Sequence, residues 1–124
     1  MGTWAPPELD LFGSAAEIGI APSRPNGSPG SCTTIWVVRI GDDLYVRSYR
    51  GPDGRWFRAA GRTQQGRIRA GGAERDITFH GPDGVDPGTV DEAYRAKYGR
   101  SSYVDAMVSR AAAGTTMKVV PRWD

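Results

Sequence analysis

Two pairs of apolar runs, each joined by a tight two-residue turn, constrain this fold more than any other feature of the sequence. Thr33–Ile40 and Asp43–Tyr49 flank the dipeptide Gly41-Asp42, and a second pair of runs over residues 66–80 flanks Gly71-Gly72. Glycine at such positions adopts the positive φ angles that two-residue hairpin turns require. Neither hairpin belongs to a strand-helix-strand repeat, so we expect an antiparallel sheet.

Helices are expected before, between and after these hairpins. Thr89 and Glu92 form a capping-box pattern, and Ser102 with Asp105 repeats it, so each pair predicts the start of a helix. The other expected elements are a helix over Pro6–Ser14, a strand over Glu17–Ala21, a loop over residues 22–31, helical turns over Arg55–Gly61, helix ends at Gly99 and Gly114, and a strand over Thr115–Val120. This order favours an α+β fold in which the strands close into a small antiparallel barrel with flanking helices.

The strand expected over Thr33–Ile40 is apolar on both of its faces. Ile35 and Val37 alternate with Trp36 and Val38, so both sets of side chains are hydrophobic. A strand of this kind is covered on both sides. We therefore expect the core on one side of it and another element on the other.

Length and composition restrict the classes of function. With 124 residues, 39% of them hydrophobic, the chain is expected to form one domain over residues 1–124. Its single cysteine, Cys32, and single histidine, His80, exclude an internal disulfide and a Cys/His metal cluster. We expect Cys32 to be a buried small hydrophobe and His80 to lie at the surface. No run approaches the ~18 apolar residues of a membrane span and no signal-peptide pattern is present, so a cytoplasmic protein without a membrane or metal site is expected.

Positive charge is concentrated in the middle of the chain, although the net charge is only +2. Residues 47–75 contain eight arginines and only two acidic residues. Guanidinium groups suit bidentate binding of phosphate or carboxylate, which indicates an anionic partner, and a solvated face is the alternative. We do not expect a nucleic-acid partner, because no nucleic-acid-binding motif is present. The eight residues are Arg47, Arg50, Arg55, Arg58, Arg62, Arg67, Arg69 and Arg75.

Five separate motifs carry a resemblance to a known family. They are TTIWVVR at residues 33–39, DLYVRS at 43–48, WFRAA at 56–60, GRIRAGG at 66–72 and AYRAKYG at 93–99. In this order they resemble a small bacterial family of uncharacterised function. The resemblance extends from Leu9 to Arg122.

The stretch from Ser23 to Phe79 is also similar, more distantly, to the split β-barrel proteins that bind flavin mononucleotide (FMN) or deazaflavin, especially the actinobacterial deazaflavin-dependent nitroreductase-like branch. That resemblance places a polar loop at Ser23–Ser31, a phosphate turn at Ser48–Gly51 and a short helix at Trp56–Arg58. It implies a split-barrel fold with FMN or deazaflavin as cofactor. The cofactor contacts that it implies are Arg24, Thr34, Trp36, Arg47, Ser48, Tyr49, Arg50, Gly51, Trp56 and Arg58.

Elementary chemistry supports part of this assignment. A phosphate prefers backbone N–H groups at a turn or helix start together with arginine, and residues 48–58 supply both. Trp36 is suited to form a flat apolar wall for an isoalloxazine-like ring. The alternatives are core packing for Trp56 and Phe57, a core or dimer-interface position for Trp36, and an ordinary hairpin exit at Ser48–Gly51.

The function favoured by the resemblance is hydride transfer between a flavin or deazaflavin and a small organic substrate, in a homodimer. The cofactor would supply the chemistry, and the protein would hold the cofactor in position. This division agrees with a chain that has only one His and one Cys. The sequence assigns no catalytic residue. The alternative is a cofactor-free protein on the same barrel that binds a small organic molecule, as a carrier or as an enzyme of secondary metabolism.

Overall fold

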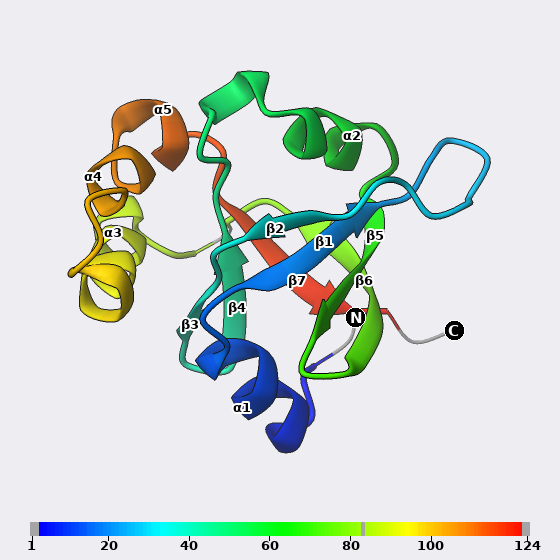
Figure 1. The fold of residues 1–124 in the computed structure, drawn as a ribbon, viewed down its shortest axis with the longest axis horizontal. Coiled ribbons are helices and arrows are strands. Elements are labelled where there is room, and N and C mark those ends of the chain that lie inside the picture. The colour runs from blue at the N-terminus through cyan, green and yellow to red at the C-terminus, as the bar shows by residue number, and fades with distance from the viewer. Residues whose placement is uncertain (1–2, 83, 123–124) are drawn as a thin grey trace.

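A computed structural model describes residues 3–82 and 84–122, and a curled antiparallel sheet forms its centre (Figure 1). Its strands are β1 (Ile18–Pro22), β2 (Thr33–Ile35), β3 (Val38–Ile40), β4 (Asp43–Val46), β5 (Gln65–Ala70), β6 (Ala73–His80) and β7 (Met117–Pro121). Their order across the sheet is β2-β1-β5-β6-β7-β4-β3, and each neighbouring pair is antiparallel. The expected antiparallel arrangement is therefore confirmed.

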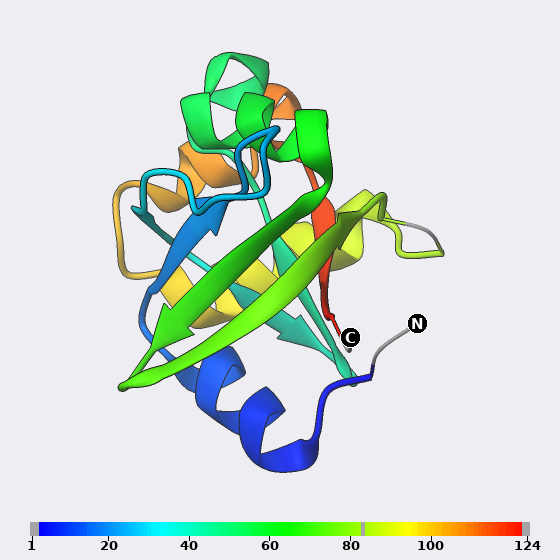
Figure 2. The same ribbon diagram turned by 90° about the vertical axis from the view of Figure 1, so that its right-hand side faces the viewer.

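Helices cover both ends and one flank of this sheet. They are α1 (Pro6–Ser14), the 3₁₀ turn η1 (Gly51–Asp53), α2 (Arg55–Thr63), α3 (Pro87–Tyr98), α4 (Val104–Met107) and α5 (Arg110–Ala113). In Figures 1 and 2, α1 and α2 lie at opposite ends of the curled sheet, and α3, α4 and α5 gather along one side. This gives the α+β class that the sequence predicts.

The prediction of a single strand over Thr33–Ile40 is wrong, because the chain leaves the sheet at Trp36 and Val37. β2 pairs with β1, whereas β3 pairs with β4, so the two halves of this segment form opposite edges of one sheet. At this break, side chains of α3 contact the chain in place of a neighbouring strand. The Val37 carbonyl accepts hydrogen bonds from Lys97 Nζ (2.7 Å) and Tyr98 Oη (3.2 Å), and the Trp36 ring stacks on the Tyr98 ring at 3.9 Å between centroids.

Two hydrophobic clusters lie on the two faces of the sheet. Inside the curl, Ile20, Leu44 and other sheet residues pack with side chains of α1 and α2. On the outer face, Val38 packs with Tyr94 and other residues of α3 and α4. Since Val37 belongs to the first cluster and Val38 to the second, the expectation that this segment is covered on both faces is confirmed.

Three local predictions need correction. α3 begins at Pro87 with Asp86 as its N-cap residue, so Thr89 lies inside the first turn; proline suits a first helical position because it lacks the N–H that would be left unbonded there. The helix predicted from Ser102 is divided into α4 and α5, because the Ser109 hydroxyl accepts a hydrogen bond from the Ala112 amide and starts a new helix. Cys32 is exposed rather than buried.

Arg47, directly after β4, connects the sheet to the helices. Its side chain is completely buried. The guanidinium donates to Thr116 Oγ1 (2.8 Å), to the backbone carbonyls of Met107 (3.0 Å) and Pro87 (3.1 Å), and to the Asp91 carboxylate. A buried charge is stable only with such partners, so this residue fixes α3 and α4 against the end of β4.

We predict that Arg47→Met lowers the free energy of unfolding by about 2–4 kcal/mol, because it leaves the Asp91 carboxylate, the buried Met107 carbonyl and the part-buried Pro87 carbonyl without their donor. Urea unfolding followed by circular dichroism measures this change. Arg69→Met is the matched control, since Arg69 is exposed on β5 and its pairing with Glu74 is worth less than ~1 kcal/mol. Equal losses in the two variants would contradict the role assigned to Arg47.

Lys97 on α3 is the second link between the helices and the sheet. Its Nζ donates to the carbonyls of Val37 and Gly13 (2.9 Å) and lies 5.1 Å from the centre of the Tyr98 ring. Burial lowers the pKa of Lys97 to about 8. A neutral amine still has two N–H groups, so both carbonyls keep their donor after deprotonation.

The lowered pKa of Lys97 predicts a stability that rises with pH. Between the folded pKa near 8 and the ordinary value of 10.5, the unfolded chain binds more protons than the folded chain. Because the amine is only half-buried, we expect the free energy of unfolding to rise by roughly 0.5–1 kcal/mol between pH 7.5 and 9.5. The difference between wild type and Lys97→Met in urea unfolding isolates this effect. A pH dependence that is identical in both proteins would disprove it.

Candidate functional site

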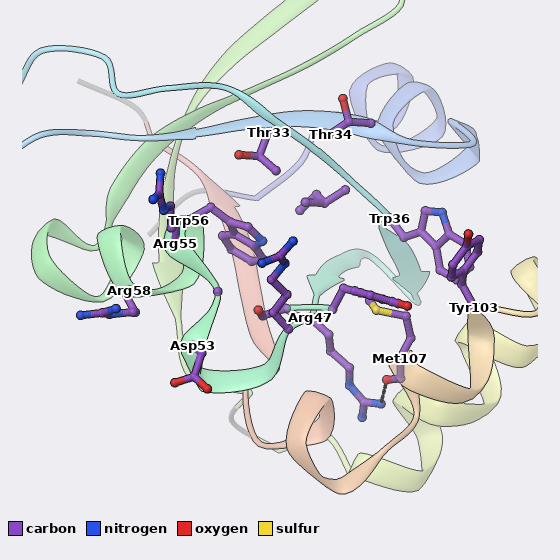
Figure 3. Close-up of a pocket in the computed structure, with 15 residues that line it drawn as sticks. Thr33, Thr34, Trp36, Arg47, Asp53, Arg55, Trp56, Arg58, Tyr103 and Met107 are labelled. Carbon is purple, nitrogen blue, oxygen red and sulfur yellow. Dashed lines mark hydrogen bonds between the residues drawn. The ribbon is translucent and has the colours of Figure 1, made fainter.

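A cavity of about 790 Å³ opens between the edge strand β2 and the corner where the chain leaves β4 and enters η1 and α2 (Figure 3). This volume is in the range typical of small-molecule sites. The residues that line it are Thr33, Thr34, Ile35, Trp36, Arg47, Ser48, Tyr49, Arg50, Asp53, Gly54, Arg55, Trp56, Arg58, Tyr103 and Met107.

The structure brings most of the predicted cofactor contacts to this cavity. Those that line it are Thr34, Trp36, Arg47, Ser48, Tyr49, Arg50, Trp56 and Arg58. Arg24 is not among the lining residues and lies in the loop after β1. Gly51 lies beneath the corner, buried against Ala111 of α5 with a φ of +66°, which glycine adopts without strain. The Arg47 guanidinium is held by the helices, so its placement favours a structural role.

The corner after β4 holds a buried hydroxyl with no hydrogen-bond partner among the described residues. Ser48 is 1% exposed, and its amide donates to Thr115 Oγ1 (2.8 Å), but its Oγ is unsatisfied. Gly54 approaches this hydroxyl so closely that a Cβ on it would lie 2.3 Å from Ser48 Oγ. Any residue larger than glycine at position 54 would therefore fill the space beside the Ser48 hydroxyl.

The first turn of α2 faces the same corner with free amide groups. Gly54 is its N-cap residue and offers no side chain to accept a hydrogen bond. Helix geometry leaves the first amides, those of Arg55, Trp56 and Phe57, without an intrahelical acceptor, whereas Arg58 N–H bonds back to the Gly54 carbonyl at 3.1 Å. Free amides and the positive end of the helix dipole attract an anion.

Three exposed arginines, Arg50, Arg55 and Arg58, surround this corner. None of them forms an ion pair with any residue in the described ranges 3–82 and 84–122. The hairpin arginines differ, because Arg67 contacts Asp76 at 3.0 Å and Arg69 lies 3.6 Å from Glu74. The corner thus presents three unpaired guanidinium groups to the cavity, together with one carboxylate, that of Asp53.

Aromatic and apolar side chains form the other part of the lining. Trp36 borders the cavity while one face of its ring is covered by Tyr98. Tyr49 and Tyr103 meet edge to face at 5.9 Å between centroids and are 52% and 61% exposed. In Figure 3, Trp36 and Tyr103 lie on one side of the view, and Trp56 and Arg58 on the other. The cavity therefore combines an anion-attracting corner with apolar walls.

The lining includes residues that were not among the predicted cofactor contacts. Gly54 and Arg55 carried a local signal, since a glycine before a helix and a free helix start are visible in the sequence. Tyr103 and Met107 carried none, because the fold brings them from α4 and the loop before it. Neither Cys32 nor His80 is among the residues that line the cavity.

Comparison with known protein families assigns the chain. Residues 8–119 match the model of DUF2255, a family described as uncharacterised proteins conserved in bacteria, and the chain belongs to this family. This confirms the predicted resemblance. A search of curated proteins finds no match.

Solved structures with the same fold confirm the predicted split barrel. HutZ, the heme storage protein from Vibrio cholerae, matches with a TM-score of 0.66 at 14% identity over 96% of this chain and 91% of its own. A FAD-binding protein from Mesorhizobium loti matches with a TM-score of 0.58 at 13% identity over 98% and 92%. A conserved hypothetical protein from Mycobacterium tuberculosis matches with a TM-score of 0.59 at 13% identity over 98% and 83%. At this level of identity the likeness establishes the fold.

Two further findings concern the described residues only. No helix among them has the length and apolar character needed to cross a membrane. They also contain no group of three or more His, Cys, Asp or Glu side chains placed to hold a metal ion.

Gly54→Ala and Gly61→Ala test the close packing of the corner. The backbone of Gly54 (φ −60°, ψ 132°) is accessible to alanine, but the added methyl group would collide with Ser48 Oγ. We expect this variant to lose about 1–3 kcal/mol of stability. Gly61 lies inside the same helix with nothing within 4 Å of its added Cβ, so alanine there should add roughly 0.5–1 kcal/mol. Thermal unfolding that shifts in the same direction for both would contradict this geometry.

Proposed function

We propose that this protein binds a flavin or deazaflavin cofactor in the cavity and acts as an oxidoreductase that transfers hydride to or from a small organic substrate. The observation that carries the proposal is the unsatisfied Ser48 hydroxyl, buried beside a free helix start and unpaired arginines. The FAD-binding protein from Mesorhizobium loti, which shares the fold, supports it.

The cofactor phosphate would occupy the corner after β4. A phosphate monoester carries a charge of about −1.5 to −2 and three acceptor oxygens. Ser48 Oγ and the first amides of α2 are donors without acceptors among the described residues, and the phosphate oxygens would accept their hydrogen bonds. The Arg50 and Arg58 guanidinium groups would neutralise the negative charge of the phosphate. Each unsatisfied group of the corner thereby obtains a partner.

The ring system would lie against the apolar lining. Ile35, Trp36 and Met107 supply flat or flexible apolar surface, and the hydroxyls of Thr33 and Thr34 on the β2 edge are suited to bond the polar edge of a ring. The bound cofactor would supply the hydride chemistry, and the side chains around it would orient the reactants and exclude water. This division of roles needs no nucleophile in the lining.

The same proposal includes a homodimer that works in the cytoplasm. The cavity opens beside β2, which is an edge strand whose Thr33 and Thr34 are exposed. Tyr49 and Tyr103 expose large aromatic surface at the same opening. Exposed aromatic side chains and an unpaired strand edge are typical of surfaces that a second subunit covers.

Titration tests the cofactor. We expect FMN or a deazaflavin to bind with a micromolar Kd and to bind more tightly than riboflavin, which lacks the phosphate, by about 10- to 100-fold. The measurements are the visible spectrum of the purified protein and fluorescence titration. Failure of both cofactors to bind would disprove the proposal. The alternative, a cofactor-free protein that binds a small organic molecule, would then be favoured.

Ser48→Ala separates a binding role from a structural one. Removal of an unsatisfied buried hydroxyl should leave the stability of the free protein unchanged or slightly higher. The same change should weaken FMN binding by about 5- to 10-fold, because one donor to the phosphate is lost. Arg69→Gln, on the outside of β5, is the control that should leave binding unchanged. Unaltered FMN binding in Ser48→Ala would place the phosphate elsewhere.

A further inference from the structure

Lys97 carries an amine that the proposed function does not use. It is not among the residues that line the cavity. The chain has only two lysines, Lys97 on α3 and Lys118 on β7, and both are half-buried. Any difference in reactivity between these two amines therefore comes from their surroundings.

The Lys97 amine is held by carbonyl groups rather than by a carboxylate. Its Nζ donates to the Gly13 carbonyl in α1 and to the Val37 carbonyl at the break in the sheet. None of the ion pairs within residues 3–82 and 84–122 includes Lys97. Burial disfavours the charged form and lowers the pKa of Lys97 to about 8. The neutral amine has two N–H groups for the two carbonyls, which directs its lone pair away from both.

A groove of about 390 Å³ borders Lys97 at the C-terminal end of α3. Two exposed arginines, Arg95 and Arg100, line the same groove. Arg95 lies 3.7 Å from Asp105, whereas Arg100 forms no ion pair with any residue that the structure describes. The groove thus offers guanidinium groups to an anion beside the Lys97 side chain.

We propose that Lys97 is a site of acylation by an acyl phosphate, whose phosphate group binds at Arg95 and Arg100. The lone pair of Nζ attacks the acyl carbon, so that an N–C bond forms and the C–O bond to the phosphate breaks. Inorganic phosphate leaves with the bonding electron pair, and the extra proton of the amine passes to water. The inference is independent of the proposed function, because the groove and the cavity share no lining residue.

Acylation of Lys97 would weaken the break in the sheet. An acylated amine has one N–H group where the neutral amine has two, so one of the two carbonyls, that of Gly13 or that of Val37, loses its Lys97 donor. Trp36 precedes Val37, lines the cavity and stacks on Tyr98. The modification would therefore act on one wall of the cavity from outside it.

Acetyl phosphate and the two lysines provide the first test. At pH 7.5 an amine with a pKa of about 8 is neutral roughly 200-fold more often than one at the ordinary value of 10.5, although its lower basicity offsets part of this gain. We expect acetyl phosphate to acetylate Lys97 about 10-fold faster than Lys118 in the folded protein, as measured by peptide mass spectrometry. After unfolding in urea the two rates should become equal. Equal rates in the folded protein, or faster acetylation of Lys118, would overturn the proposal.

Arg100→Gln tests the role of the groove. It should slow the acetylation of Lys97 by acetyl phosphate about 3- to 5-fold, because one cation that attracts the phosphate is lost. Acetylation by the uncharged N-hydroxysuccinimide ester of acetate should not change. Arg110→Gln, which removes an exposed charge from α5, is the control and should affect neither reagent. If Arg100→Gln changes both reagents equally or changes neither, the groove does not bind the acyl phosphate and that part of the proposal is wrong.

The stability of the acetylated protein tests the effect on the fold. Acetylated wild type should unfold at a lower urea concentration than the unmodified protein, because a carbonyl at the break loses its donor. The control is Lys97→Arg treated in the same way, in which Lys118 is the only lysine and the midpoint should stay unchanged. Equal shifts in wild type and Lys97→Arg would disprove the link between Lys97 and the break.

Discussion

The buried guanidinium of Arg47 is the interaction on which the rest of the structure depends. A buried charge forces its surroundings to supply acceptors, and here they come from α3, from the end of α4 and from the residue before β7. The chain leaves Arg47 directly into Ser48, whose amide bonds Thr115 two residues before β7. The corner that forms one wall of the cavity is therefore positioned by Arg47, whose guanidinium donates four hydrogen bonds to these structural partners.

The break at Trp36 and Val37 has a comparable effect on the opposite wall. One short segment supplies both edges of the sheet, so the sheet must curl until its edges meet at the break. Away from the break the edges diverge, and the cavity opens between β2 and the end of β4. Lys97 and Tyr98 stabilise this arrangement because they donate to the Val37 carbonyl, which has left the strand ladder. The site is thus a consequence of an incompletely closed barrel.

Features with a local cause could be predicted from the sequence. The hairpin around Gly71-Gly72 follows from its turn dipeptide, and the corner at Ser48–Gly51 follows from a strand end, a glycine and a helix start. The break at Val37 could not be predicted, because its hydrogen-bond partners lie some 60 residues away on α3. Arg47 resembled the other arginines of a basic segment, and only the fold shows that it is buried. Sequence reasoning therefore named residues that line one cavity, but it misjudged what holds this part of the fold together.

Three conflicts with local stability rules meet at the corner after β4. Near the end of β4 the chain buries an unsatisfied hydroxyl, begins α2 without a cap and puts an arginine in its first turn. Each feature costs stability in the free protein, and a bound anion would satisfy all three. A ligand at 100 times its Kd adds about 2.7 kcal/mol to the folded state, which is comparable to the sum of such costs. α1 and α3 also begin without a side-chain cap, and Tyr94 Oη is likewise buried without a partner among the described residues. What distinguishes the corner is that its unsatisfied hydroxyl, free amides and unpaired arginines meet beside one cavity, and this combination favours binding as its explanation.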